Sequence, residues 1–107
     1  MKFYRYENVR IYDVLGAVVN LLKYELVKET PKGYWIKPSW DYSDEYKRWV
    51  SNNGKNRHAY PTKEEALLNF QRRKEREIFL LKDRLENAQS ALYQVPNLNK
   101  ELEDANN

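Results

Sequence analysis

The side chains best suited to catalysis are few in this sequence. His58 is the only histidine among the 107 residues, and cysteine is absent. A metal site with several histidine ligands or with thiolate ligands is therefore excluded, and so is a disulfide. We interpret His58 as a strand residue near a turn rather than as a catalytic base.

The carboxylates, glycines and serines show no pattern typical of a catalytic or phosphate-binding site. Asp41, Asp44 and Glu45 lack the ligand spacing of a calcium loop, so we interpret them as a solvated acidic loop. The three glycines are scattered, which excludes a glycine-rich phosphate cradle, and no serine lies in a nucleophile elbow. We therefore predict that the protein is not an enzyme and has no catalytic residue, metal site or cofactor.

Basic side chains near aromatic rings give the clearest indication of binding. The segment 46–62, YKRWVSNNGKNRHAYPT, contains no acidic residue, and the chain carries a formal net charge of +3. Such side chains could contact phosphates while the rings stack on bases, or they could simply solvate an antiparallel hairpin and a helix face. The candidate binding residues are Lys47, Arg48, Trp49, Lys55, Arg57, His58, Tyr60, Arg72 and Arg73.

Tyrosine and tryptophan give a second indication of binding. The chain has nine tyrosines and three tryptophans, more than a small sheet can bury completely. Exposed aromatic rings beside arginines are typical of the energetic centre of a protein-binding surface. The sequence leaves open whether the surface meets another protein, nucleic acid or an anionic nucleotide. The aromatic residues concerned are Tyr34, Trp35, Trp40, Tyr42, Tyr46 and Trp49.

Strand patterns and turn residues predict a β-rich segment over residues 1–60. Residues 2–6, KFYRY, alternate as a strand does, and residues 21–30 and 34–38 are predicted to form a hairpin around the turn residues of PKG. Residues 12–20 fit either a strand or a short helix.

A second hairpin is predicted between residues 46 and 60. Its turn would be Asn53-Gly54, a strong signal for a tight connection between two strands. Residues 38–46 are predicted to form a loop before this hairpin, because they contain a proline, two serines and three acidic residues.

A long amphipathic helix is predicted over residues 62–95. Thr62 and Glu65 form the pattern of a capping box, and apolar residues then recur at helical spacings with no glycine or proline before Pro96. Pro96 is expected to stop the helix, which leaves residues 96–107 as a polar, flexible tail.

The second half of this helix carries an apolar seam spaced as in a coiled coil. About 32 helical residues span roughly 48 Å, which is longer than the strands of a small sheet, so the helix should outrun the sheet. Either the apolar segment 12–22 covers the seam or a second copy of the chain does, and we predict a homodimer. The seam residues are Ile78, Leu81, Leu85, Ala88 and Leu92.

These patterns predict an α+β fold, in which a small antiparallel sheet is followed by one long C-terminal helix, with residues 1–95 as a single domain. The longest apolar stretch is too short to cross a bilayer, and the N-terminal residues lack the apolar run of a signal peptide. We expect a soluble cytoplasmic protein without a membrane partner.

Two sequence stretches, VKETPKGYWI and KRWVSNNGKNRHAYPTKEEALLNFQRRKEREI, resemble small accessory proteins encoded by bacteriophages and prophages. The resemblance covers roughly residues 22–92 and rests on an ETPKGYWI-type hairpin and an AYPTKEEAL strand-to-helix junction. It implies a viral accessory protein in the cytoplasm of an infected bacterium. Such proteins often bind host machinery, including immune effectors.

A weaker similarity links residues 34–72 to the arm-DNA-binding domains of phage integrases. It rests on a strand, a basic turn, a second strand and the PTKEEAL motif. In that family a three-stranded sheet meets DNA and a helix lies behind it, although the helix of this chain is much longer. The similarity implies DNA contact by Lys47, Arg48, Lys55 and Arg57.

We therefore expect a non-enzymatic, phage-type interaction protein. It would inhibit a host defence system, of the anti-CRISPR or anti-restriction type, by binding an effector and occluding it. The alternative is a DNA- or RNA-binding module that uses the basic hairpin at residues 47–58. A further alternative is a sponge that captures an anionic nucleotide signal.

Overall fold

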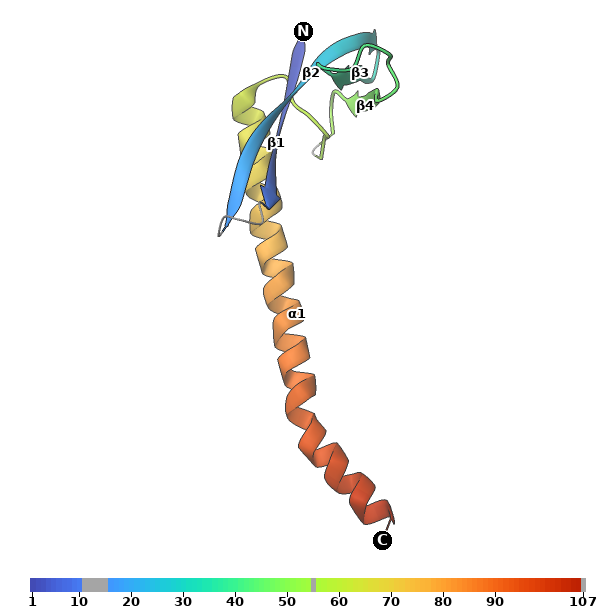
Figure 1. The fold of residues 1–107 in the computed structure, drawn as a ribbon. Coiled ribbons are helices and arrows are strands. Elements are labelled where there is room, and N and C mark those ends of the chain that lie inside the picture. The colour runs from blue at the N-terminus through green and yellow to red at the C-terminus, as the bar shows by residue number, and fades with distance from the viewer. Residues whose placement is uncertain (11–15, 55, 107) are drawn as a thin grey trace. The chain divides into compact units, whose positions relative to one another are not determined.

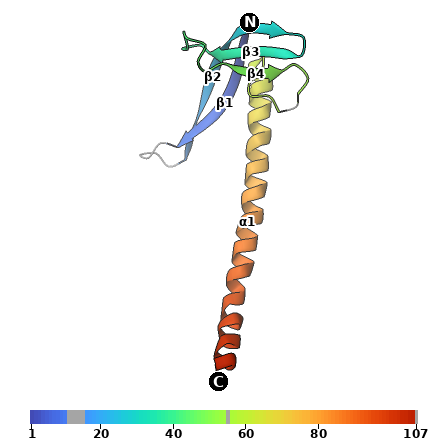
Figure 2. The same cartoon turned by 90° about the vertical axis from the view of Figure 1, so that its right-hand side faces the viewer.

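The protein consists of one curled antiparallel sheet followed by one long helix. The computed structural model describes residues 1–10, 16–54 and 56–106 (Figure 1). The four strands pair in chain order, as the turned view also shows (Figure 2). The predicted α+β fold class is therefore confirmed. The elements are β1 (Lys2–Arg10), β2 (Ala17–Thr30), β3 (Gly33–Pro38), β4 (Arg48–Ser51) and α1 (Lys63–Asn106).

The chain divides into two compact units, Met1–Arg72 and Arg73–Asn107. The first unit contains the sheet and the first turns of α1, and the second contains the remaining turns of α1. The boundary that we predicted at residue 95 falls inside α1.

Strand β1 pairs with β2 over its whole length, from Lys2 opposite Glu25 to Arg10 opposite Ala17. This confirms the strand predicted at residues 2–6. Residues 17–20 of the ambiguous segment belong to β2, so this part is strand rather than helix. Residues 12–15 of that segment lie outside the described residues.

Strands β2 and β3 form the hairpin that the PKG turn predicted. The Thr30 hydroxyl closes the turn, since it donates to the Gly33 carbonyl at 2.8 Å and accepts from the Gly33 N–H at 3.1 Å. Residues 22–26 of β2 alternate between inward positions, which are buried or half-buried, and exposed positions, and a bulge then shifts the register between Leu26 and Lys28. Before the bulge Leu26 lies opposite Ile36, and both residues face the core. After the bulge Lys28 lies opposite Trp35.

The core lies on one face of the sheet and includes a residue from beyond β4. Its buried members pack together with the half-buried Leu22, Leu26 and Tyr34. The rings of Phe3 and Tyr34 lie with their centroids 5.3 Å apart. The buried set is Phe3, Tyr24, Ile36, Val50 and Ala59.

The second predicted hairpin, at residues 46–60, is wrong. Its first half forms β4, which pairs with β3, but no returning strand pairs with β4 in the described part of residues 52–60. Instead, the chain reaches the far edge of the sheet, where Tyr60 and Tyr4 exchange backbone hydrogen bonds of 2.7 and 2.9 Å. The buried Ala59 joins the core on the way, so core burial overrides the local Asn53-Gly54 turn signal.

Helix α1 starts at the predicted cap. The Glu65 N–H donates to the Thr62 hydroxyl at 3.2 Å, and that hydroxyl donates to the Glu65 carboxylate at 3.0 Å. The first turns pack on the sheet unit, since Ala66 is buried and the Asn69 amide donates to the Tyr60 hydroxyl at 3.0 Å.

The predicted end of the helix at Pro96 is wrong, because α1 continues through this residue to Asn106. Proline removes the hydrogen bond that would reach the Leu92 carbonyl, at a cost of about 3 kcal/mol relative to alanine. Several good helix formers follow, from Leu98 to Ala105. The predicted flexible tail is therefore helical as far as residue 106.

Replacing Gly33 with alanine should destabilise the sheet by about 3 kcal/mol or more. An added Cβ would lie 2.2 Å from the Val50 carbonyl oxygen and 2.7 Å from the Trp49 ring, and the backbone carbonyl cannot move away easily. Urea denaturation measures the change in the free energy of unfolding. Gly54→Ala is the matched control, since its nearest heavy atom is Ser51 Cβ at 3.3 Å. Equal losses for the two variants would contradict the close contact of β3 with β4.

Candidate functional site

The predicted basic and aromatic residues do not form one face. Trp49 lies directly opposite Trp35, whereas Arg48 lies opposite the core residue Ile36. Because neighbouring strand residues point to opposite sides of a sheet, Trp49 and Arg48 are on different faces. Lys47 belongs with the tryptophans, since its Nζ lies 5.5 Å from the centroid of the Trp35 ring.

Arg57, His58 and Tyr60 of the predicted binding residues hold in place the segment between β4 and α1. We call it the covering segment, because it covers part of the core. The Arg57 guanidinium donates to the Gly54 carbonyl at 3.0 Å and lies 5.5 Å from the centre of the Tyr60 ring. His58 Nε2 and the Tyr24 hydroxyl are hydrogen-bonded at 2.9 Å. Tyr60 is itself buried. These residues act within the fold rather than as a basic surface.

Three predicted binding residues remain to be placed. Lys55 lies outside the described residues. Arg72 is exposed at the end of the first unit, and Arg73 is the first residue of the second unit.

A polar cluster surrounds the Tyr24 hydroxyl on the core side of the sheet. Arg5 donates to the His58 carbonyl at 2.8 Å and pairs with Glu7 at 2.6 Å. Burial raises the pKa of Tyr24, and the positive charges of Arg48 and Arg5 oppose that shift. The raised pKa keeps the Tyr24 hydroxyl protonated at neutral pH. The half-buried cluster attaches the covering segment to β1 and β2.

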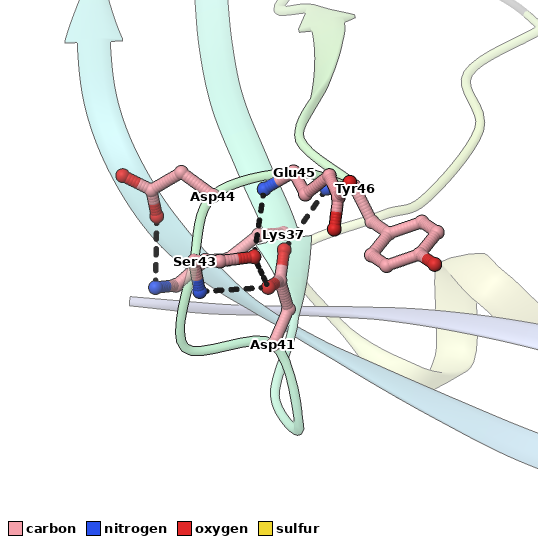
Figure 3. A network of polar contacts seen from close by, with 6 residues as sticks. All are labelled: Lys37, Asp41, Ser43, Asp44, Glu45 and Tyr46. Carbon is pink, nitrogen blue, oxygen red and sulfur yellow. Dashed lines mark hydrogen bonds and ion pairs between the residues drawn. The ribbon is translucent and has the colours of Figure 1, made fainter.

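The loop between β3 and β4 contains a structural carboxylate that sequence reasoning missed. Asp41 was predicted to be solvated, yet it is only 4% exposed. One of its oxygens accepts from the Ser43 N–H and the Ser43 hydroxyl, both at 2.8 Å, and the other accepts from the Tyr46 N–H at 3.0 Å (Figure 3). The Asp-x-Ser pattern at residues 41–43 is the signal that could have indicated this turn.

These bonds favour the ionised form of Asp41. Its pKa lies below the usual 3.8, first because the Tyr46 N–H donates to the carboxylate and then because Ser43 does so, against the opposing effect of burial. The neighbouring Asp44 adopts a left-handed backbone conformation, with φ 62°, and pairs with Lys37 at 2.9 Å. The loop conformation is thus held at two of its three acidic residues, Asp41 and Asp44.

This held loop displays aromatic side chains to solvent. Trp40 and Tyr46 lie with ring centroids 5.0 Å apart, and both are more than half exposed. Tyr42 is 95% exposed, and the Trp49 ring packs over Gly33 with 45% of its residue surface still accessible. All belong to β3, β4 or the loop between them. We define the aromatic surface as Trp35, Trp40, Tyr42, Tyr46 and Trp49.

Comparison with protein-family models, with curated proteins and with solved structures gives no match. In the described part of the chain, no group of three or more histidine, cysteine, aspartate or glutamate side chains could hold a metal ion. The helix described here contains no stretch that is both long and apolar enough to cross a membrane. Because its rings are exposed on an ordered loop and strand, the aromatic surface is the best candidate for a functional site among the described residues.

Asp41→Asn should loosen the loop between β3 and β4. It should also remove part of the loss of stability that the protein shows at low pH. A carboxylate with a lowered pKa stabilises the fold above pH 3.8, and this contribution is lost as the pH falls through the pKa of the folded state. The amide has only one acceptor oxygen, so it cannot accept from both Ser43 and Tyr46. Tryptophan fluorescence reports the change, because all three tryptophans lie on this surface.

The matched control for this experiment is Asp44→Asn. It removes the exposed ion pair with Lys37 but leaves the bonds of Asp41 intact, so it should keep the acid transition of the wild type. An Asp41→Asn variant with the same acid transition as the wild type would show that this carboxylate does not organise the loop.

Proposed function

We propose that the protein is a non-enzymatic binding protein that docks on another protein through the aromatic surface. The observation that carries this proposal is the exposure of Trp49 on β4 and of Trp40, Tyr42 and Tyr46 on a loop held by Asp41. Tryptophan and tyrosine supply much of the binding energy at protein interfaces. A loop that is already ordered loses little conformational entropy when it binds.

The charges near this surface favour a protein over nucleic acid. Lys37 is paired with Asp44, and Glu45 lies next to Tyr46, so acidic and basic groups are mixed. A nucleic-acid site needs a track of basic side chains that neutralises successive phosphates. Of the residues predicted to form that track, Lys47 and Arg48 lie on different faces of the sheet, and Arg57 is bonded within the covering segment.

The resemblance to phage accessory proteins supports a partner in a bacterial host. We extend the proposal to inhibition of a defence effector, such as a CRISPR or restriction component. Inhibition would follow from occlusion, because the protein would cover a surface that the effector needs for its own substrate. This step rests on the resemblance, whereas the docking surface rests on the exposed aromatic residues.

Trp40→Ala and Trp49→Ala should each weaken binding of the partner about 30-fold, which corresponds to about 2 kcal/mol. The partner is first captured from host lysate, identified by mass spectrometry and purified, and the dissociation constants are then measured by calorimetry. Tyr93→Ala is the matched control, because this aromatic residue is 85% exposed and belongs to the other unit, outside the aromatic surface. Unchanged affinity in both tryptophan variants would contradict the proposal.

A nucleic-acid module remains the rival, favoured by the position of Lys47 over the Trp35 ring. Binding of labelled single-stranded and duplex DNA across a salt series separates the two functions. We expect no steep dependence of affinity on salt for the wild type. A steep slope that is lost in Lys47→Ala/Arg48→Ala would replace the protein partner with nucleic acid.

A further inference from the structure

The unit Arg73–Asn107 exposes a regular apolar seam. Its large members are all at least 42% exposed. Their separations are three, four or seven residues, and each separation of seven spans an intervening a or d position of a coiled coil, Ala88 or Asn99. The exposed members are Ile78, Leu81, Leu85, Leu92, Val95 and Leu102.

The continuation of α1 through Pro96 lengthens this seam beyond the predicted residues. If Ile78 is placed at an a position, Asn99 becomes the fourth a position and Leu102 the fourth d position. Pro96 itself takes an e position, beside the seam rather than within it. The seam therefore covers residues 78–102 and contains one polar residue, Asn99.

We propose that this seam binds a second copy of the chain as a parallel, in-register, two-stranded coiled coil. A single asparagine at an a position specifies register and two-stranded assembly, since the two amides can hydrogen-bond across the interface. In this arrangement Asn99 of one copy meets Asn99 of the other. The proposal is independent of what the aromatic surface binds.

Charge complementarity supports a copy of the same chain as the occupant. In parallel pairs, a g residue lies near the e residue five positions later in the other helix. Glu77 is a g residue and Lys82 is the corresponding e residue, so a symmetric pair of attractive contacts results. Glu77 also pairs with Lys74 of its own helix at 2.8 Å, an exposed contact that it can share.

The antiparallel arrangement fits these residues less well. Full overlap of the seam would place residue 78 opposite residue 102, and therefore Asn99 opposite Leu81. A buried amide without a polar partner is costly. Lys82 would then lie near Pro96 rather than near Glu77, so the favourable charge contacts are lost as well.

Light scattering tests the assembly itself. The wild type should have twice the 13.0 kDa mass of one chain at micromolar concentrations. Leu85→Glu, within the seam, should give the mass of one chain, whereas Tyr93→Glu, on another face of the helix, should keep the doubled mass. Tryptophan fluorescence verifies that the sheet unit stays folded, because the three tryptophans lie between residues 35 and 49.

Engineered cysteines test the orientation, because the natural chain contains none. In the parallel pair residue 81 faces residue 81 of the other copy, so Leu81→Cys alone should form a covalent dimer with oxidised glutathione. In the antiparallel pair the two cysteines would be about 27 Å apart along the axis. Covalent dimers would then form only when Leu81→Cys is mixed with Asn99→Cys.

The outcomes separate the parallel pair from every other arrangement. A single-chain mass for the wild type, a mass above that of two chains, or an undiminished mass for Leu85→Glu overturns the proposed dimer. Crosslinking only in the mixture of Leu81→Cys and Asn99→Cys overturns the parallel orientation. A doubled mass, its loss in Leu85→Glu and crosslinking of Leu81→Cys with itself support the proposal.

Discussion

The structure depends on how the apolar face of the sheet is covered. Phe3, Tyr24, Ile36 and Val50 bury their side chains there, and Ala59 completes the cluster from the segment after β4. Burial of apolar surface is the dominant favourable contribution to folding, so this segment leaves β4 and ends at β1. The pairing of Tyr60 with Tyr4 ends the segment two residues before the cap of α1.

This covering segment also decides which side chains remain for binding. Arg57 and His58 form hydrogen bonds that hold the segment in place, so they are not part of an open basic patch. The other face of β3 and β4 carries Trp35 and Trp49, and the loop between these strands adds Trp40 and other aromatic residues. The side chains that the first unit exposes there are consequently aromatic with mixed charge rather than strongly basic.

Sequence patterns predicted the features that local interactions determine. The strands, the first hairpin and the cap at Thr62 follow from alternation, turn residues and hydrogen bonds over three positions. The two wrong predictions arise where a local signal competes with a larger favourable contribution to the free energy. At residues 46–60 the turn signal competes with the burial of Ala59, and at Pro96 the proline competes with the good helix formers that follow it. The burial of Asp41 was missed because the Asp-x-Ser pattern indicates only the two donors on Ser43, whereas the donor on Tyr46 becomes apparent only when the loop is folded.

The two exposed apolar surfaces differ in a way that suits two kinds of contact. The aromatic surface combines rings with hydroxyl and indole N–H groups, which can be solvated when no partner is present. The seam of Leu81, Leu85 and Leu92 is aliphatic and has no polar groups that water can solvate, so its exposure to water is unfavourable. A permanent homotypic interface therefore fits the seam, whereas a reversible interface fits the aromatic surface. A dimer formed through the seam would carry two aromatic surfaces. A partner with two matching sites would then bind more tightly, because the first contact raises the effective concentration of the second site.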